Sequence, residues 1–202
     1  MITHAVGLSL GAASSIESGV AVREISSGKL IYVDKLFSMN DISLFFDNYP
    51  SLNSSVICVS IPWDITMLEG KWRVLSKPYQ MINSTENTHF LNTDNWTQRF
   101  SSRGSDLLKG LKEKGADISR FEVYLTRQKL NLYSNYKERS SADCKFLQNA
   151  LKLEYGFEEI PANMMPVAQL EAIVGTILAE EKLKNNTKKI FEFNNLDVIN
   201  VI

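Results

Sequence analysis

Residues 5–22 contain two short apolar runs separated by a tract of small residues. The first run is Val6-Gly7-Leu8-Ser9-Leu10-Gly11, and the second ends in Gly19-Val20-Ala21-Val22. An apolar run, a turn of Gly, Ala and Ser, and a second apolar run predict two antiparallel strands joined by a tight loop. The chain therefore begins with a β-hairpin, and its first strand is the element around which the remaining strands are expected to assemble.

The next segments extend this hairpin into an α/β fold. The turn residues Ser27-Gly28 and the alternation in residues 29–36 predict a third antiparallel strand. Asn40 is expected to cap a helix over residues 41–48. The nearly continuous apolar run at residues 56–61 predicts a central strand that is covered on both faces.

Later segments predict further helices and strands. Expected helices cover residues 105–114, 141–153 and 167–183, and expected strands cover residues 121–126, 189–193 and 196–202. Pro166 is well suited to open the long helix. The apolar residues expected to be buried together around one sheet are Leu8, Leu10, Val20, Val22, Ile57, Val59, Val123, Leu170, Val174 and Ile177.

Periodicity disappears between residues 62 and 100. The segment carries Trp63, Trp72, Tyr79, Phe90, Trp96 and Phe100 among polar residues. Loops of this length are uncommon in compact domains unless they are functional, and the aromatic residues argue against simple disorder. We therefore expect a single domain over residues 1–202 with a long excursion at about residues 62–104, which covers the end of the sheet near Ser9 and Ser60 as a partly mobile lid.

Composition narrows the possible compartments and partners. The 202 residues carry a net charge near -1, which gives no general attraction for phosphate backbones. Cys58 and Cys144 have no spacing typical of a metal site or redox pair and are expected to be reduced, structural thiols. The sequence lacks a signal peptide and any apolar stretch long enough to span a bilayer, so we expect a cytoplasmic protein that does not bind membranes.

Three segments together resemble the predicted-nuclease family known as domain of unknown function 429, in the ribonuclease H-like superfamily. They are Val6-Gly7-Leu8-Ser9-Leu10-Gly11, Val59-Ser60-Ile61-Pro62 and Pro166-Val167-Ala168-Gln169-Leu170-Glu171-Ala172-Ile173; Phe121-Glu122-Val123-Tyr124 is similar to a further family strand. The resemblance implies a ribonuclease H-like α/β fold with a mixed five-stranded sheet in the order 3-2-1-4-5, flanked by helices. It also implies acidic residues on strand 1, on the buried strand and on the last helix.

This chain departs from that acidic pattern at two of the three places. Ser9 and Ser60 stand where Asp is expected, and Glu171 keeps a carboxylate. Two-metal hydrolysis needs carboxylates that hold two cations about 3.5–4 Å apart, and a serine hydroxyl is a weak, neutral ligand. Asp64 and Glu122 could supply part of a displaced catalytic site, with Mg²⁺ or Mn²⁺ as cofactor under that interpretation.

Glu171 is the most unusual residue of the long helix. At 100° per residue it falls between an apolar arc that contains Leu170 and Val174 and an arc of small residues that contains Ala172 and Gly175. It should therefore face the sheet, where an unpaired carboxylate is costly. Two interpretations stay open: a structural ion pair or a hydrogen bond to Ser9 or Ser60, and a surviving active site.

Two segments could bind an anion. The small-residue turn at residues 11–15 could bind phosphate through backbone N–H groups, although a hairpin turn explains it as well. Arg99, Arg103 and the first turn of the helix after Ser105 could form a second site, although a solvated surface patch is the simpler interpretation. A nucleic acid or phosphorylated ligand is the class of partner that either site would take.

Two functional hypotheses follow. The favoured one is a divergent, non-catalytic ribonuclease H-like protein that acts as a binding or scaffold domain, with Ser9, Ser60, Arg99 and Arg103 as candidate ligand-binding residues. The alternative is a metal-dependent nuclease or phosphoesterase with a displaced acidic site made of Glu171, Asp64 and Glu122. The sequence does not identify a substrate or an oligomeric state.

Overall fold

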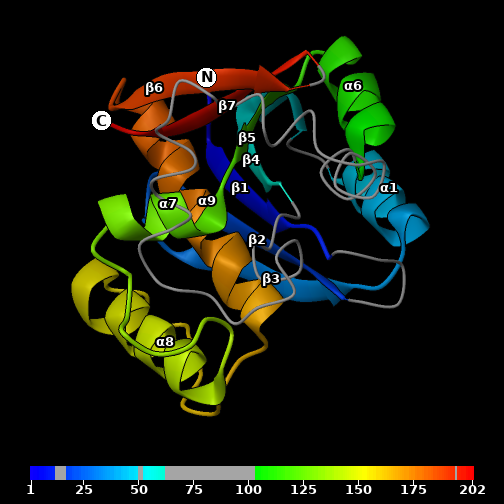
Figure 1. Cartoon of the computed structure of the whole chain (residues 1–202). Coiled ribbons are helices and arrows are strands. Elements are labelled where there is room, and N and C mark those ends of the chain that lie inside the picture. Colours follow the sequence, from blue (N-terminus) through cyan, green and yellow to red (C-terminus); the bar gives the residue numbers. More distant parts are fainter. Residues whose placement is uncertain (12–16, 50–51, 62–102, 194) are drawn as a thin grey trace, which may run out of the picture.

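The computed structural model describes residues 1–11, 17–49, 52–61, 103–193 and 195–202 (Figure 1). The described strands are β1 (His4–Ser9), β2 (Ser18–Glu24), β3 (Leu30–Leu36), β4 (Ser55–Ser60), β5 (Asp117–Phe121), β6 (Thr187–Phe193) and β7 (Leu196–Val201). The described α-helices are α1 (Met39–Asn48), α6 (Ser105–Glu113), α7 (Val123–Lys129), α8 (Ser141–Tyr155) and α9 (Val167–Leu183).

The strands form one mixed sheet in the order β3-β2-β1-β4-β5-β7-β6. β1, β2 and β3 pair antiparallel, whereas β4, β5 and β7 continue the sheet parallel to β1. The expected order 3-2-1-4-5 is confirmed, and β1 lies between β2 and β4 as predicted. The expected number of five strands is wrong, because the C-terminal hairpin joins the same sheet: β7 pairs with β5, and β6 forms the edge.

Capping side chains fix the start of α1 at a different residue from the one that the sequence pattern indicated. α1 begins after Ser38 rather than after Asn40, because the Ser38 hydroxyl accepts from the Asp41 N–H at 3.1 Å and the Asp41 carboxylate accepts from the Ser38 N–H at 2.8 Å. This reciprocal pair satisfies two N–H groups that the first helical turn leaves without partners. The helix therefore starts two residues earlier than the sequence pattern indicated.

The strand predicted at residues 121–126 is wrong. β5 ends at Phe121, and α7 begins at Val123 after Glu122, whose carboxylate accepts from the Leu125 N–H at 2.6 Å. Val123 to Arg127 are all buried, so the segment shows neither the alternation of a half-buried strand nor one apolar helix face. The N-capping carboxylate starts the helix here, and local periodicity does not reveal it.

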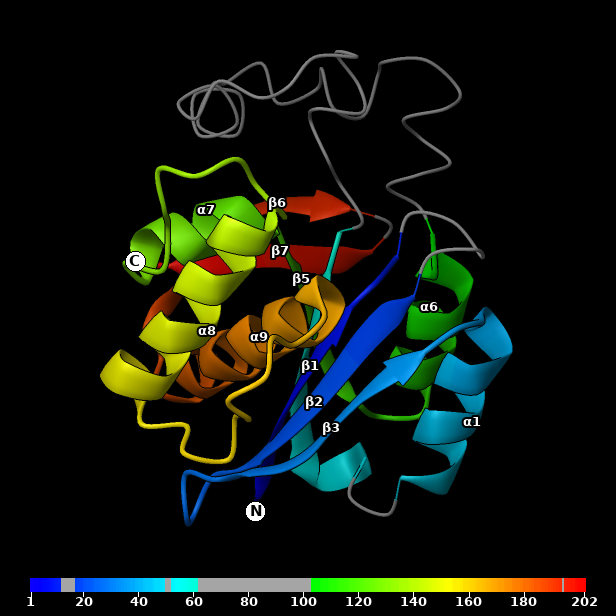
Figure 2. The same cartoon turned by 90° about the horizontal axis from the view of Figure 1, so that it is seen from below.

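Helices cover both faces of the sheet (Figure 2). α9 crosses one face with α7 and α8 beside it, and α1 and α6 cover the other face. The ten residues expected in the core are all buried, and they divide between the two layers. Val123, Leu170, Val174 and Ile177 belong to the layer on the α9 side, and the other six belong to the layer on the α1 and α6 side.

Strand alternation turns Ser9 and Ser60 toward α9. Leu8 and Val59 pack in the α1 and α6 layer, so their neighbours Ser9 and Ser60 point to the opposite face. Gly7 lies on that same face and lets the backbone of α9 approach β1, because a Cβ atom there would lie 2.8 Å from the Thr176 nitrogen. Within the described ranges, no helix is long and apolar enough to cross a membrane.

Candidate functional site

Glu171 lies at the interface between α9 and the carboxyl end of β1, and it is 0% exposed. Its Oε2 accepts a hydrogen bond of 2.7 Å from the Ser9 hydroxyl. The Arg139 guanidinium donates from Nε to Oε1 at 3.0 Å and from Nη2 to Oε2 at 2.8 Å. The prediction that Glu171 faces the sheet and lies in contact with the Ser9 region is confirmed.

Arg139 comes from the connection between α7 and α8. Its backbone adopts a left-handed conformation with φ 56°, which is uncommon for a residue other than glycine. The Arg139 N–H donates to Oδ2 of Asp143 at 3.0 Å, so Asp143 fixes the turn from which the guanidinium reaches Glu171. The Arg139 side chain is 34% exposed, while its partner carboxylate is fully buried.

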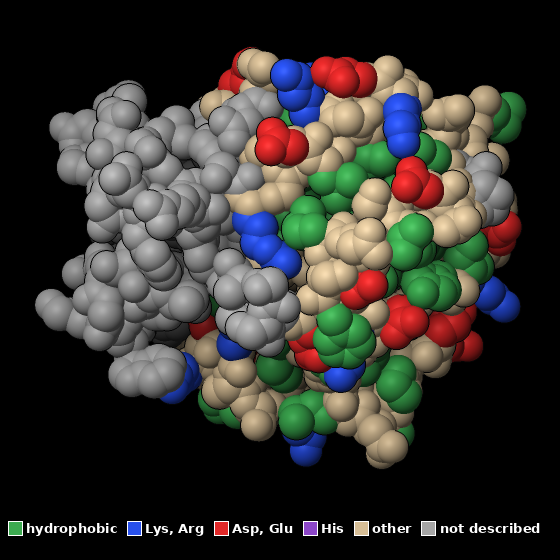
Figure 3. Space-filling model, turned by 90° about the vertical axis from the view of Figure 1, so that its right-hand side faces the viewer, with side chains coloured by type: hydrophobic (Ala, Val, Ile, Leu, Met, Phe, Trp, Pro, Cys, Tyr) green, Lys and Arg blue, Asp and Glu red, His purple; other side chains and the backbone are tan. Residues whose placement is uncertain are grey.

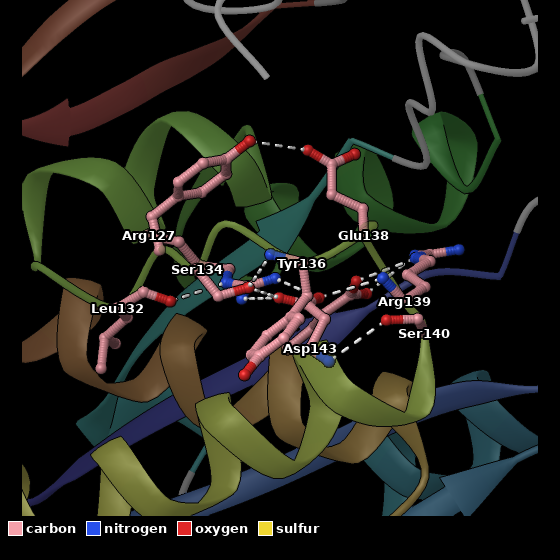
Figure 4. A network of polar contacts seen from close by, with 10 residues as sticks. Arg127, Leu132, Ser134, Tyr136, Glu138, Arg139, Ser140 and Asp143 are labelled. Atoms are coloured by element: carbon pink, nitrogen blue, oxygen red, sulfur yellow. Dashed lines mark hydrogen bonds and ion pairs between the residues drawn. The ribbon is translucent and has the colours of Figure 1, made fainter. Parts of the chain in front are cut away.

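Asp143 is itself held by a buried arginine (Figure 4). Arg127 donates from Nη1 to Oδ2 at 3.0 Å and from Nη2 to Oδ1 at 2.7 Å, and Ser134 donates to Oδ1 at 2.6 Å. The Nε of Arg127 donates to the Leu132 carbonyl at 3.1 Å, which anchors the start of the same connection. A bidentate arginine–carboxylate pair thus orients the backbone that positions Arg139.

These contacts determine the protonation of the buried pair. Burial alone would raise the pKa of Asp143, but the hydrogen bonds and charge of Arg127, with the donors Ser134 and Arg139 N–H, hold it below its usual value. Burial alone would lower the pKa of Arg127, but Asp143 raises it above its usual value. Both side chains are therefore charged at neutral pH.

The two serines at the expected acidic positions have different contacts. Ser9 donates to Glu171, as described above. The Ser60 hydroxyl accepts from the Leu10 N–H at 2.9 Å and so joins the end of β4 to the end of β1. Both hydroxyls serve as hydrogen-bonding groups in the packing of these strands.

The structure does not bring the expected acids together into one described cluster. Glu122 lies at the end of β5, where its carboxylate caps α7. Asp64 lies outside the described residues. Among the residues that the structure describes, no group of three or more His, Cys, Asp and Glu side chains could hold a metal ion.

The described residues do not fit a two-metal centre. Both oxygens of Glu171 already accept hydrogen bonds from the Arg139 guanidinium, which supplies a positive charge where a bound cation would otherwise neutralise the carboxylate. Ser9 and Ser60 add hydroxyl groups, which carry no charge to hold a second ion. What this arrangement can do is orient Arg139 and close the connection between α7 and α8 onto the sheet.

Arg103 lies immediately before Gly104, the N-cap of α6, and its guanidinium donates to the Gly11 carbonyl. Arg120, which is fully buried, donates to the Ser105 hydroxyl at 3.3 Å and to the Arg103 carbonyl at 3.2 Å. Burial lowers the pKa of Arg103 and lowers that of Arg120 to about 10. Arg99, most of the turn at residues 11–15 and the segment expected to form a lid lie outside the described residues, so both anion sites stay predictions.

The face that carries α1 and α6 shows hydrophobic groups among charged side chains of both signs (Figure 3). In the described part of this face, Lys and Arg do not gather into a continuous stripe of the kind that follows a nucleic-acid backbone. This mixture agrees with the net charge near -1.

The sequence patterns did not identify Arg127, Arg139 and Asp143 as parts of the site. One local pattern was present, because Ser140 caps α8 by accepting from the Asp143 N–H at 3.2 Å, a spacing typical of helix starts. The pairing of Arg139 with Glu171 spans 32 positions and depends on the left-handed turn at Arg139. No protein-family model, curated protein or solved structure matches this chain.

Proposed function

We propose that this chain is a ribonuclease H-like protein, similar to the family of domain of unknown function 429, that does not hydrolyse phosphodiesters and acts as a binding or scaffold domain. The strand order supports the resemblance, because β3-β2-β1-β4-β5 with three antiparallel strands first is the arrangement that the resemblance implies. Ser9, Glu171 and Ser60 stand at the places where that family implies acids.

One observation carries the non-catalytic part of the proposal: the buried Glu171 carboxylate is fully engaged by Arg139 and Ser9. For Glu171 to bind a divalent cation, the Arg139 guanidinium would have to leave, and the cation would have to compete with a bidentate charged hydrogen bond. The neighbouring Ser9 and Ser60 would not add charge to favour that exchange. Glu171 therefore serves the structure of this region rather than a reaction.

The binding part of the proposal rests on where these residues lie. Open α/β sheets bind ligands outside the carboxyl ends of their parallel strands. The last residues of β1, β4 and β5 are Ser9, Ser60 and Phe121. Three arginines approach the same end of the sheet: Arg103 contacts Gly11, Arg120 contacts Ser105, and Arg139 contacts Glu171. Ser9, Ser60 and Arg120 are buried. A ligand there would meet the partly exposed guanidinium groups of Arg103 and Arg139, which suit binding of an anion better than metal-dependent cleavage.

The test compares wild type with Glu171→Gln. We expect wild type to cleave neither RNA, DNA nor a chromogenic phosphodiester in the presence of Mn²⁺ or Mg²⁺. We expect Glu171→Gln to lower the free energy of unfolding by about 1–3 kcal/mol, because the amide leaves Arg139 without its charged partner. Urea unfolding measures the loss, and Glu113→Gln on the exposed side of α6 should change stability by no more than about 0.5 kcal/mol.

The opposite result would identify an enzyme. If wild type cleaves one of these substrates with Mn²⁺, and Glu171→Gln is as stable as wild type but inactive, the proposal is wrong and the displaced acidic site with Glu171 is the better explanation.

A further inference from the structure

Large apolar side chains gather at the edge of the sheet formed by β3. Ile31 and Phe37 are more than half exposed, Tyr32 lies beside them, and Met164 projects into solvent from the connection that follows α8. Within the described part of the chain, β3 pairs with β2 on one side and with no strand on the other (Figure 2). Exposed apolar groups concentrated along a free strand edge are typical of an interaction surface.

A groove of about 510 Å³ lies along this edge, between β3 and the connection from α8 to α9. Ile31, Val33, Met164 and Met165 form its apolar walls, and Glu159 is the charged residue in its lining. A segment that added to β3 would place alternate side chains in this groove. A basic side chain among them would complement Glu159.

We propose that the segment is β3 of a second copy of this chain, paired antiparallel to the first about a two-fold axis through Val33. In such a pair, residues directly opposite each other point to the same face of the sheet. The axis at Val33 sets Tyr32 opposite Asp34 of the second copy, twice by symmetry, and sets the two Val33 side chains against each other. Within one copy the Tyr32 hydroxyl already donates to Asp34 at 3.1 Å, so these groups are suitable partners.

Charge disfavours the registers displaced toward the C-terminal end of β3. An axis through Asp34 would set two aspartates opposite each other, and an axis through Lys35 would set two lysines opposite each other, which is destabilising. The axis at Val33 instead sets Lys35 of the second copy opposite Ile31, which lines the groove together with Glu159. Lys35 is thus the basic side chain that the groove can accept, and its present contact with Glu17, at 3.2 Å, is partly exposed.

The two edges of the sheet differ in a way that favours β3 as the interface. On the edge strand β6, Lys189 pairs with Glu192 and Asp197 in contacts of 2.8 Å and 2.7 Å, and such charges protect an edge from further pairing. On β3, a bulge leaves Ile31 without an opposite residue in β2, and bulges weaken edge pairing, so the regular ladder between two copies would run only from Tyr32 to Asp34. The shared ladder is short, and we expect a weak dimer with a dissociation constant on the order of micromolar.

Sedimentation velocity of the full chain tests the proposal. The protein concentration should be varied from about 1 to about 100 μM, a range that includes the expected dissociation constant. Wild type should convert from monomer to dimer with concentration. Glu159→Lys should raise the dissociation constant about tenfold, because it faces Lys35 of the second copy. The double variant Lys35→Glu with Glu159→Lys should restore the dimer, and the control Glu158→Lys, which alters an exposed residue outside the groove, should leave it unchanged.

Oxidation of Val33→Cys tests the register directly. The two introduced cysteines should form an intermolecular disulfide, because opposite residues across a strand pair lie about 5 Å apart, whereas Cys58 and Cys144 are buried and should not react. A chain that stays monomeric throughout the concentration range overturns the proposal. So does a dimer that responds equally to Glu159→Lys and Glu158→Lys, or one in which Val33→Cys does not cross-link.

Discussion

At the scale of single residues, two ion pairs are connected in series. Arg127 holds Asp143, Asp143 accepts from the Arg139 N–H, and the Arg139 side chain holds Glu171. Each step is a hydrogen bond to a charged group, which is stronger than one between neutral groups. Substitution of Asp143 should therefore leave Arg139 less well fixed, and it should also break the ion pair with Arg127.

The contribution of the Arg127–Asp143 pair to stability should depend on pH, and Asp143→Asn tests this. The variant leaves the Arg127 charge buried without its anion, so at pH 7 we expect a loss of about 3–5 kcal/mol in the free energy of unfolding. Because the pKa of Asp143 lies below its usual value of about 3.9, the stabilisation is fully present above about pH 4 and is lost as the pH falls toward the folded-state pKa.

Urea unfolding at a series of pH values measures this difference. The gap between wild type and Asp143→Asn should narrow below about pH 4. Asp47→Asn provides the control, because the exposed contact between Lys114 and Asp47 contributes no more than about 1 kcal/mol. Aspartates titrate down to about pH 3. If the difference in unfolding free energy between wild type and Asp143→Asn stays constant down to that pH, Asp143 does not titrate as described.

At the scale of elements, α9 lies close to the sheet because glycines face it. A Cβ atom at Gly19 would lie 2.6 Å from the Gln169 nitrogen, and one at Gly175 would lie 2.9 Å from the Cα of Gly7. These approaches bring Glu171 within reach of Ser9. The glycines are thus part of the geometry of the site as well as of the core.

Gly7→Ala should separate α9 from β1. The added methyl group would collide with the backbone of Ala172 and Thr176, and backbone cannot move aside as a side chain can. We expect destabilisation of about 3 kcal/mol, at the upper end of the range for an overpacked core, measured by urea unfolding. Gly110→Ala in α6 has open space around it and should stabilise the protein by about 0.5–1 kcal/mol. Equal effects of the two substitutions would contradict this description of the contact.

Local sequence patterns predicted two kinds of element: strands that a short turn joins to their neighbour, and strands or helices with a regular pattern of apolar residues. The spacing around Glu171 predicted that it faces the sheet, and the apolar runs in β1 and β4 predicted a central pair of strands. The pattern failed at Val123 to Arg127, where burial on all sides removes any periodic contrast. It could not assign β7 to β5 or Arg139 to Glu171, because both depend on contacts between distant segments.

At the scale of the whole molecule, one sheet carries two distinct features. The carboxyl ends of β1 and β4 carry the Glu171 site, while the edge strand β3 of the described sheet carries the proposed dimer surface. In an antiparallel β3 pair the two sheets would continue as one, and each copy would keep its own Glu171 site. Dimerisation and the loss of hydrolysis are therefore independent proposals, and failure of one leaves the other standing.

The Arg139 guanidinium occupies the place that a cation would need at Glu171. Titration of wild type with Mn²⁺ in an isothermal calorimeter, with Glu171→Gln titrated in parallel, measures whether a cation can displace the guanidinium. We expect the same non-saturating heats of dilution from both proteins. Saturable binding of Mn²⁺ to wild type that disappears in a folded Glu171→Gln variant would contradict this expectation.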